Sequence, residues 1–246
     1  MAQKKRYGFV IDVSRCIDCR ACLVACSVEN GVPMAHTRIW VKDPGVQGEF
    51  PNLTRQFVPY NCMHCEHPPC VEVCVSGATY KDADTGLVLV DQDACIGCGY
   101  CVEACPYDAR YLDETRRVVD KCTGCAQRLE IGREPACVAT CLGGARMFGD
   151  LYDPASTVSV ALKNARSIQT LDYEKGSVDT DPNLYFINGA PLDASLQPRD
   201  PRYTLAEDGW KNVLVPLVGL GVGGAFLVQA TYFAKQLLEG EKEFEE

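Results

Sequence analysis

The sequence is poor in histidine and in runs of basic residues, and each shortage removes a class of function. It has three histidines, all within the first 67 of its 246 positions, which gives no basis for a Ser/His/Asp set or a histidine-rich metal centre. Its longest basic run is Lys4-Lys5-Arg6 and its formal net charge is -9, so it offers nucleic acid no positive surface. A P-loop pattern is also absent from the sequence. We therefore predict no catalytic residue and no nucleic-acid partner.

The N-terminus shows no secretion signal. Residues 1–16 pass from basic side chains directly into a cysteine motif, with no apolar stretch and no small-residue cleavage site. If the protein works outside the cytoplasm, we expect a partner to carry it across the membrane.

Cysteine, in contrast, is abundant and regularly placed. The chain has sixteen cysteines and is too long for the small secreted disulfide scaffold in which such density is otherwise found. They form four groups that each end in CxxxC, an internal repeat that favours metal binding. The groups are Cys16, Cys19, Cys22 and Cys26; Cys62, Cys65, Cys70 and Cys74; Cys95, Cys98, Cys101 and Cys105; and Cys122, Cys125, Cys137 and Cys141. In groups two to four an alanine follows four residues after the last cysteine, at Ala78, Ala109 and Ala145, so these repeats share a backbone plan.

Group three has the most specific spacing. Its sequence, CIGCGYCVEACP, is the CxxCxxCxxxCP run in which three cysteines bind one 4Fe-4S cluster and the fourth binds a neighbouring cluster. Gly97 and Gly99 allow the loop to fold tightly, and Pro106 is expected to begin a helix. Between groups two and three, the runs ATY and LVLV flank a turn-rich DADTG and predict a β-hairpin. A motif, a hairpin and a second motif are the plan of a bacterial two-cluster ferredoxin.

The same crossed pairing, applied to all four groups, uses every cysteine. Groups two and three form an inner unit, and groups one and four form an outer unit around it. The predicted ligand sets of clusters 1 to 4 are Cys16, Cys19, Cys22 and Cys141; Cys26, Cys122, Cys125 and Cys137; Cys62, Cys65, Cys70 and Cys105; and Cys74, Cys95, Cys98 and Cys101. Zinc is the main alternative, because CxxC pairs also build tetrahedral sites. The third and fourth cysteines at this spacing favour four 4Fe-4S clusters.

Other polar residues near the motifs have open roles. His64 and His67 could replace a ligand or donate to a cluster sulfur, although the cysteines already saturate the sites and an ordinary loop role is favoured. Several basic residues either offset cluster charge or are simply solvated. They are Lys81, Arg110, Lys121, Arg128 and Arg133.

One segment near the C-terminus matches a membrane span. Residues 213–234 run for 22 residues without a charge, about 33 Å as a helix, against a hydrocarbon core of about 30 Å. Trp210 before the segment and Lys235 after it suit the two membrane interfaces. Gly219 and Gly223 leave one helix face open to a neighbouring helix. A helix buried in a protein core is the alternative.

These features predict an α+β fold made of two intertwined two-cluster ferredoxin-like units, a C-terminal extension and one transmembrane helix. The four-cluster domain is expected in residues 1–150, with the inner unit at about 57–112 and the outer unit at 7–30 and 115–150. The rest of the chain is expected to be a surface extension at 151–209, the transmembrane helix at 210–236 and an acidic tail at 237–246.

Three stretches together carry a family resemblance. CMHCEHPPCVEVCVSGATY, CIGCGYCVEACPYDARYL and KCTGCAQRLEIGREPACVATC resemble the four-cluster iron–sulfur (beta) subunit of molybdopterin oxidoreductases of the DMSO reductase superfamily. The resemblance covers about residues 7–151 and is to the polysulfide, thiosulfate and tetrathionate reductase branch. From GWKNVLVPL onward the chain is similar instead to the membrane-bound formate dehydrogenase subunit. Val75 and Leu142 stand where the family usually has proline, but every ligand position is intact.

The resemblance implies a non-catalytic electron-transfer subunit of a respiratory complex used in anaerobic respiration. Its partners would be a molybdenum or tungsten bis-pterin catalytic subunit, facing the outer cluster pair, and a quinone-reactive integral membrane subunit, facing the inner pair. The chain would be a single-pass protein of the cytoplasmic membrane with its globular part on the periplasmic side. The alternative is an electron relay of a membrane hydrogenase or multihaem cytochrome complex, in which the same four clusters would carry electrons between other subunits. A zinc-stabilised scaffold is the alternative without redox chemistry.

Overall fold

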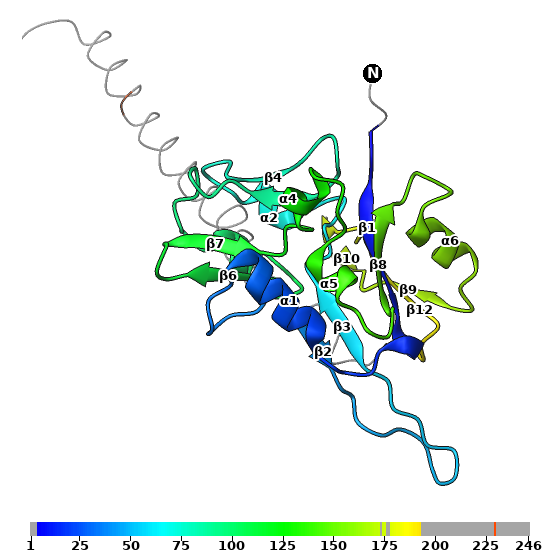
Figure 1. Ribbon diagram of the computed structural model, residues 1–246. Helices are drawn as coiled ribbons and strands as arrows, with labels where there is room; N and C mark the ends of the chain where they lie inside the picture. Colours follow the sequence, from blue (N-terminus) through cyan, green and yellow to red (C-terminus); the bar gives the residue numbers. More distant parts are fainter. Residues whose placement is uncertain (1–3, 173, 176–177, 193–228, 230–246) are drawn as a thin grey trace, which may run out of the picture. The chain divides into compact units, whose positions relative to one another are not determined.

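A computed structural model of the chain describes residues 4–172, 174–175, 178–192 and 229 (Figure 1). By its internal contacts the chain divides into two units, Met1–Pro201 and Arg202–Glu246. The predicted membrane span at 213–234 and the predicted acidic tail lie outside the described residues, apart from Gln229. Within the described ranges, no helix combines the length and the apolar character needed to cross a membrane.

A four-stranded sheet holds the first and the last parts of the described chain together. Its strand order is β8 (Arg146–Asp150), β1 (Tyr7–Asp12), β12 (Leu184–Ile187) and β9 (Ile168–Gln169). β1 runs parallel to β12 and antiparallel to β8. The middle of β1 is apolar and buried on both faces, which suits a strand covered from two sides.

The two faces of this sheet contribute to different apolar clusters. Phe9, Ile11 and Phe186 belong to the main core, which also contains buried cysteines from groups one to four. On the other face, Val10 and Ile187 pack with Val158 of helix α6 (Thr157–Lys163). The sheet therefore forms one wall of the cysteine-rich body, and α6 covers its back (Figure 1).

The segment expected to be a surface extension is partly interior. Leu184 and Phe186 of β12 are fully buried, and Leu171 is nearly so. A four-residue strand within a Pro- and Asp-rich stretch carries too little periodicity to be recognised from the sequence. Residues 151–192 therefore contribute a strand to the core as well as a helix to its surface. A two-residue pair, β10 (Glu174–Lys175) and β11 (Val178–Asp179), lies in the same region.

Three β-hairpins occupy the rest of the body. The hairpin predicted between groups two and three is present as β4 (Thr79–Lys81) and β5 (Val88–Val90), which pair antiparallel. A second hairpin consists of β2 (Ile39–Lys42) and β3 (Val58–Asn61), which pair antiparallel. The third hairpin is β6 (Arg110–Asp113) with β7 (Val118–Lys121), and the loop between β2 and β3 stands out from the body (Figure 1).

The helices of the body are mostly single turns tied to the cysteine motifs. They are α1 (Ala21–Asn30), α2 (Pro69–Glu72), α3 (Tyr100–Glu103), α4 (Ala126–Leu129) and α5 (Ala136–Ala139), with a 3-10 turn η1 (Val13–Arg15) after β1. The third cysteine of every group is the second residue of one of these helices, at Cys22, Cys70, Cys101 and Cys137.

The prediction that Pro106 begins a helix is wrong. Residues 106–107 form a turn that leads into β6, and the helix of group three, α3, comes before the last cysteine of the group. Proline is found at a helix start near the third cysteine of a group instead of after the fourth. Pro69 is the first residue of α2, and Pro135 directly precedes α5.

Candidate metal centres

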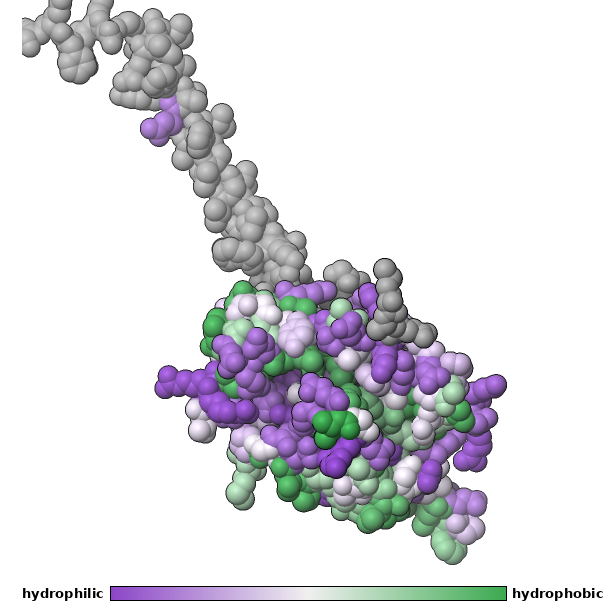
Figure 2. Space-filling view, turned by 45° about the horizontal axis from the view of Figure 1, so that its top comes forward, coloured by the Kyte–Doolittle hydropathy of each residue, from purple (hydrophilic) through white to green (hydrophobic). Residues whose placement is uncertain are grey.

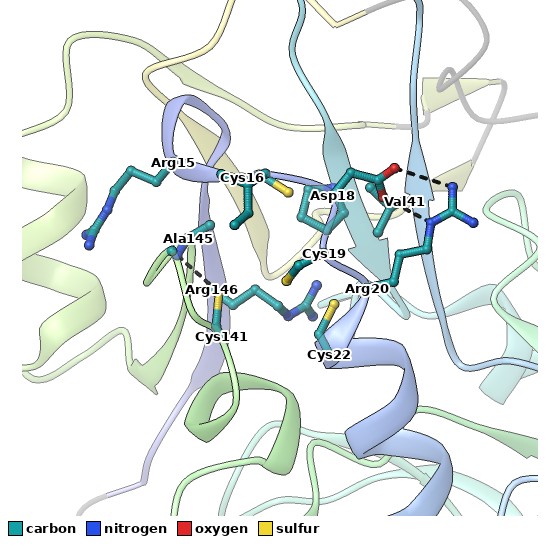
Figure 3. A pocket seen from close by; sticks show the side chains of 13 residues that line it. Arg15, Cys16, Asp18, Cys19, Arg20, Cys22, Val41, Cys141, Ala145 and Arg146 are labelled. Carbon is teal, nitrogen blue, oxygen red and sulfur yellow. Dashed lines mark hydrogen bonds and ion pairs between the residues drawn. The ribbon is translucent and has the colours of Figure 1, made fainter.

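A first cavity in the body brings together cysteines from opposite ends of the repeat. Cys16, Cys19 and Cys22 border it from the segment between β1 and α1, and Cys141 borders it from the turn before β8. Figure 3 shows their sulfur atoms around a common space, into which the guanidinium group of Arg146 extends. These are the four cysteines predicted as the ligands of cluster 1.

Two more cavities each bring together another predicted set. The second is bordered by Cys26, Cys122, Cys125 and Cys137, the set predicted for cluster 2. The third is bordered by Cys62, Cys65, Cys70 and Cys105, the set predicted for cluster 3. In both cavities, three cysteines come from one group and the fourth from its partner group, as the crossed pairing requires.

The cysteines predicted for cluster 4 lie around the packed pair of helices α2 and α3. Cys101 and Cys95 belong to one small apolar cluster with Cys70, and Cys74 lies two residues after the end of α2. The N–H of Val119 donates to Sγ of Cys95 (3.4 Å), which ties this set to strand β7. Cys98 is exposed.

The four sets differ systematically in burial. All eight cysteines predicted for clusters 2 and 3 are buried. The sets predicted for clusters 1 and 4 each contain one exposed, two half-buried and one buried cysteine. The exposed members are Cys19 and Cys98.

Backbone N–H groups point at the sulfur atoms, which fits sites for a negatively charged cluster. The N–H of Ala145 donates to Sγ of Cys141 (3.2 Å), and the N–H of Thr79 donates to Sγ of Cys74 (3.2 Å). Ala145 is the alanine that recurs four residues after the last cysteine in groups two to four, and it is buried. Such bonds favour thiolate over thiol and stabilise a metal–sulfur cluster that carries negative charge.

The buried thiols resist ionisation unless positive charge is supplied. Burial raises the pKa of Cys26 and of Cys105 to about 12, and neighbouring thiols add to this. Burial likewise raises the pKa of Cys122. At Cys74, burial opposes ionisation, but hydrogen bonds led by the N–H of Thr79 lower the pKa overall. A cysteine that binds a metal must be a thiolate. The positive charge of bound iron would therefore be needed to stabilise four thiolates in one buried space.

No group of three or more His, Cys, Asp or Glu side chains in the described ranges is arranged for a single metal ion. Around each cavity, four cysteines instead border a shared space, as the ligands of separate irons in a cubane do. The residues present therefore fit 4Fe-4S clusters.

Of the basic residues named from the sequence, two are buried and three are not. Arg110 and Lys121 lie inside the body, with Arg110 bordering the third cavity. Arg128 makes an ion pair with Glu29, Lys81 makes one with Glu66, and Arg133 is exposed.

Arg146 was not singled out from the sequence, although it is buried and borders the first cavity. A usable signal was present, because arginine follows the repeated alanine both at Ala109-Arg110 and at Ala145-Arg146.

The two histidines of group two have different surroundings. His67 is exposed, and the N–H of Glu66 beside it bonds the carbonyl of Asp181. His64 is 1% exposed, and its Nδ1 accepts from the N–H of Val88 (3.1 Å). Burial lowers the pKa of His64 well below its usual value, with the charges of Lys121 and Arg110 adding to this. The imidazole is therefore neutral and is held against strand β5.

Comparison with known proteins agrees with this interpretation of the cysteines. Two models of a 4Fe-4S dicluster domain match, one at residues 8–75 and the other at residues 53–151. The B subunit of tetrathionate reductase from Salmonella typhimurium is 44% identical over 186 residues, which are 75% of this chain and 73% of the relative.

Two further relatives cover a similar part of the chain. Protein NrfC of Escherichia coli is 43% identical over 181 residues, 73% of this chain and 79% of the relative. The B subunit of polysulfide reductase from Wolinella succinogenes is 39% identical over 188 residues, 74% of this chain and 94% of the relative.

Identity at this level over most of both chains, together with two dicluster domains and sixteen cysteines, shows what the chain is. It is an iron–sulfur electron-transfer subunit that carries four 4Fe-4S clusters, and it belongs to the family of four-cluster subunits of the DMSO reductase superfamily.

Proposed function

We propose that the chain relays electrons in the cluster order 1, 2, 3, 4 between a molybdopterin catalytic subunit and a quinone-reactive membrane subunit. The ligands of this relay are the four cysteine sets that border the cavities and the α2–α3 region. Each cluster supplies a site that accepts and releases one electron. The protein supplies the thiolates, the N–H groups directed at them, and a body that excludes water from the two middle sites.

The observation that carries this proposal is the burial of the four sets. Electrons must enter and leave at sites near the surface, whereas an intermediate site is best shielded from solvent. The cluster 1 and cluster 4 sets contain the exposed Cys19 and Cys98, and the sets between them are fully buried. This pattern supports a chain of sites with two accessible ends.

Contacts between neighbouring sets support the same order. Cys122 of the cluster 2 set has its pKa raised first by burial and then by nearby thiols, among them Cys62 of the cluster 3 set. Nδ2 of Asn61, the residue next to Cys62, lies 3.8 Å from Sγ of Cys122. Between the cluster 3 and 4 sets, Cys70 and Cys101 share one small core cluster.

Apolar side chains are exposed beside each accessible end. Ile17 is 62% exposed and Leu142 is 78% exposed beside the cluster 1 cysteines, and Val75 and Ile96 are similarly exposed beside the cluster 4 cysteines. On the face seen in Figure 2, hydrophobic side chains of this kind are interspersed with hydrophilic ones. Small apolar surfaces next to an accessible redox site suit contact with a partner that exchanges electrons there.

The two ends are assigned to partners by family resemblance. Cluster 1 and the outer pair would face the pterin subunit, and cluster 4 and the inner pair would face the membrane subunit. The charge-free segment 213–234 would attach the chain to the cytoplasmic membrane as a single span, with the globular part on the periplasmic side. Gly219 and Gly223 would let it pack closely against a helix of the membrane partner.

A relay for a membrane hydrogenase or multihaem cytochrome would use the same chain differently. Metal analysis of the purified complex separates these functions. We expect molybdenum or tungsten, whereas nickel or haem iron without either metal would reject the proposed catalytic partner.

The experiment that tests the relay compares Cys98→Ser with Cys19→Ser in the intact complex. Cys98→Ser should stop electron transfer to quinone while the catalytic subunit keeps its activity with a soluble dye. Cys19→Ser should leave the inner pair reducible from the quinol side and cut it off from the catalytic substrate. Unchanged quinone activity in Cys98→Ser would contradict the relay, because it would show that electrons bypass cluster 4.

A further inference from the structure

Two buried arginines occupy equivalent positions in the two units. Arg110 and Arg146 each follow the last cysteine of their group by five residues, come directly after the repeated alanine, and are the first residue of a strand, β6 or β8. Arg110 is 5% exposed and Arg146 is 3% exposed. Such burial is rare for arginine unless its charge is compensated.

In the outer unit, Arg146 lies between the cysteine sets of clusters 1 and 2. It borders the first cavity, where its guanidinium group extends among Cys19, Cys22 and Cys141 (Figure 3). Its charge also acts on Cys137 and Cys122 of the cluster 2 set. One nitrogen, Nη2, donates to Oδ1 of Asn61. Its other two nitrogens, Nε and Nη1, are buried and have no hydrogen-bond partner among the described residues.

In the inner unit, Arg110 has the same relation to the sets of clusters 3 and 4. It borders the third cavity, and its charge acts on Cys70 of the cluster 3 set and Cys101 of the cluster 4 set. Nη1 donates to Oγ1 of Thr79 (3.2 Å). Nε and Nη2 are buried without a hydrogen-bond partner among the described residues. Both arginines thus have buried N–H donors without a hydrogen-bond partner, and both border a cavity lined by four cysteines.

Other buried cations in the described ranges are already satisfied by the protein. Arg38 donates twice to Asp120 within 2.8 Å, so its charge is offset by a carboxylate. Nζ of Lys121 donates to the carbonyls of Val88 and Cys122. No ion pair with a carboxylate is found for Arg110 or Arg146 among the described residues. Their counter-charge must come from the clusters.

We propose that Arg110 and Arg146 each supply a fixed positive charge that raises the reduction potentials of the two clusters of its own unit. An added electron makes a cluster more negative, and a fixed cation in a water-poor interior stabilises that reduced state more than the oxidised one. Because each arginine faces both sets of its unit, it shifts the two clusters together. This inference rests on the ligand sets of the proposed function.

The test is a redox titration of the purified complex, followed by electron paramagnetic resonance, for Arg110→Gln and Arg146→Gln. Each substitution should reduce the equilibrium constant for one-electron reduction about tenfold, or about 59 mV, at the clusters of its own unit. The clusters of the other unit serve as the internal control and should keep their potentials. Arg110→Lys and Arg146→Lys retain the charge and should return the potentials most of the way to those of the unchanged protein.

Iron and acid-labile sulfide are measured on the same samples. Four clusters at unchanged potentials in both Gln variants would overturn the proposal, as would equal shifts in both units. If a Gln variant loses the clusters of its own unit, recovery of those clusters in the Lys variant supports a charge role, and failure to recover them overturns it. Loss of clusters from both units also overturns it. Fewer than four clusters in the unchanged protein would instead contradict the ligand sets.

Discussion

The predicted inner and outer units contain the same kind of paired cysteine motifs but are assembled in different ways. The inner unit is built from one continuous stretch, Cys62 to Cys105, with the β4–β5 hairpin between its two motifs. The outer unit joins Cys16–Cys26 to Cys122–Cys141, and it is closed by strands β1, β8 and β12. The first depends on local turn chemistry, and the second depends on pairing between distant segments.

This difference shows that four cysteines can border a common cavity without coming from a contiguous chain. In both units the third cysteine sits at the start of a helix and an arginine follows the last motif. What changes is the structure that holds the two motifs together, a hairpin in one unit and a sheet in the other. The two units should therefore respond differently to the same kind of perturbation.

The largest effect is expected from Phe186→Ala, which removes the fully buried side chain that β12 contributes to the main core. The cavity should lower the free energy of unfolding by about 3–5 kcal/mol. Clusters 1 and 2 should be lost first, because β12 pairs with β1 of the outer unit. The measurement is denaturant unfolding followed by cluster absorbance, with Tyr80→Ala on the half-exposed inner hairpin as the control. Equal destabilisation by both variants would remove the distinction between the units.

A smaller effect is expected from Arg38→Met, which breaks the buried ion pair with Asp120 and so frees the start of β2 from β7. Loss of the closest counter-charge of Asp120 should lower the free energy of unfolding by about 3 kcal/mol, the lower end of the usual range. The carboxylate keeps two partners, because the Tyr111 hydroxyl (2.5 Å) and Nη2 of Arg116 (3.4 Å) still donate to it. Arg116→Met is the matched control, since Arg116 is half-exposed and should contribute less than about 1 kcal/mol. If the control proved equally harmful, the buried pair would not be what holds the start of β2 to β7.

The smallest effect concerns the tight loop of group three. Gly97 has φ +68° and a Cβ there would collide with the carbonyl oxygen of Arg117, whereas Gly99 has φ +80° and open space around it. Gly97→Ala should lower the free energy of unfolding by about 2 kcal/mol, and Gly99→Ala by about 1 kcal/mol, the cost of the left-handed conformation alone. Urea unfolding of both variants measures the difference. Equal values would mean that the loop moves freely away from Arg117.

The parts of the molecule that the sequence predicts well are those whose signals are local. The cysteine repeat and the hairpin at DADTG each depend on neighbouring residues, and both are present. The strand β12 was not predicted, because its partner β1 lies at the other end of the domain. The role of Arg146 was missed for a related reason: only the folded chain places it beside Cys22 and Cys137. The helix expected at Pro106 failed because the motif puts its helix before the last cysteine.

The parallel pairing of β1 with β12 has a consequence for the order in which the protein matures. The chain is synthesised from its N-terminus, so Tyr7–Asp12 must wait for Leu184–Ile187 to leave the ribosome before this pair of strands can form. By then the whole of the inner unit has already emerged. Cluster insertion during synthesis is therefore expected to begin in the inner unit. Clusters 1 and 2 of the outer unit are expected to be stably bound only after β12 has been synthesised and has paired with β1.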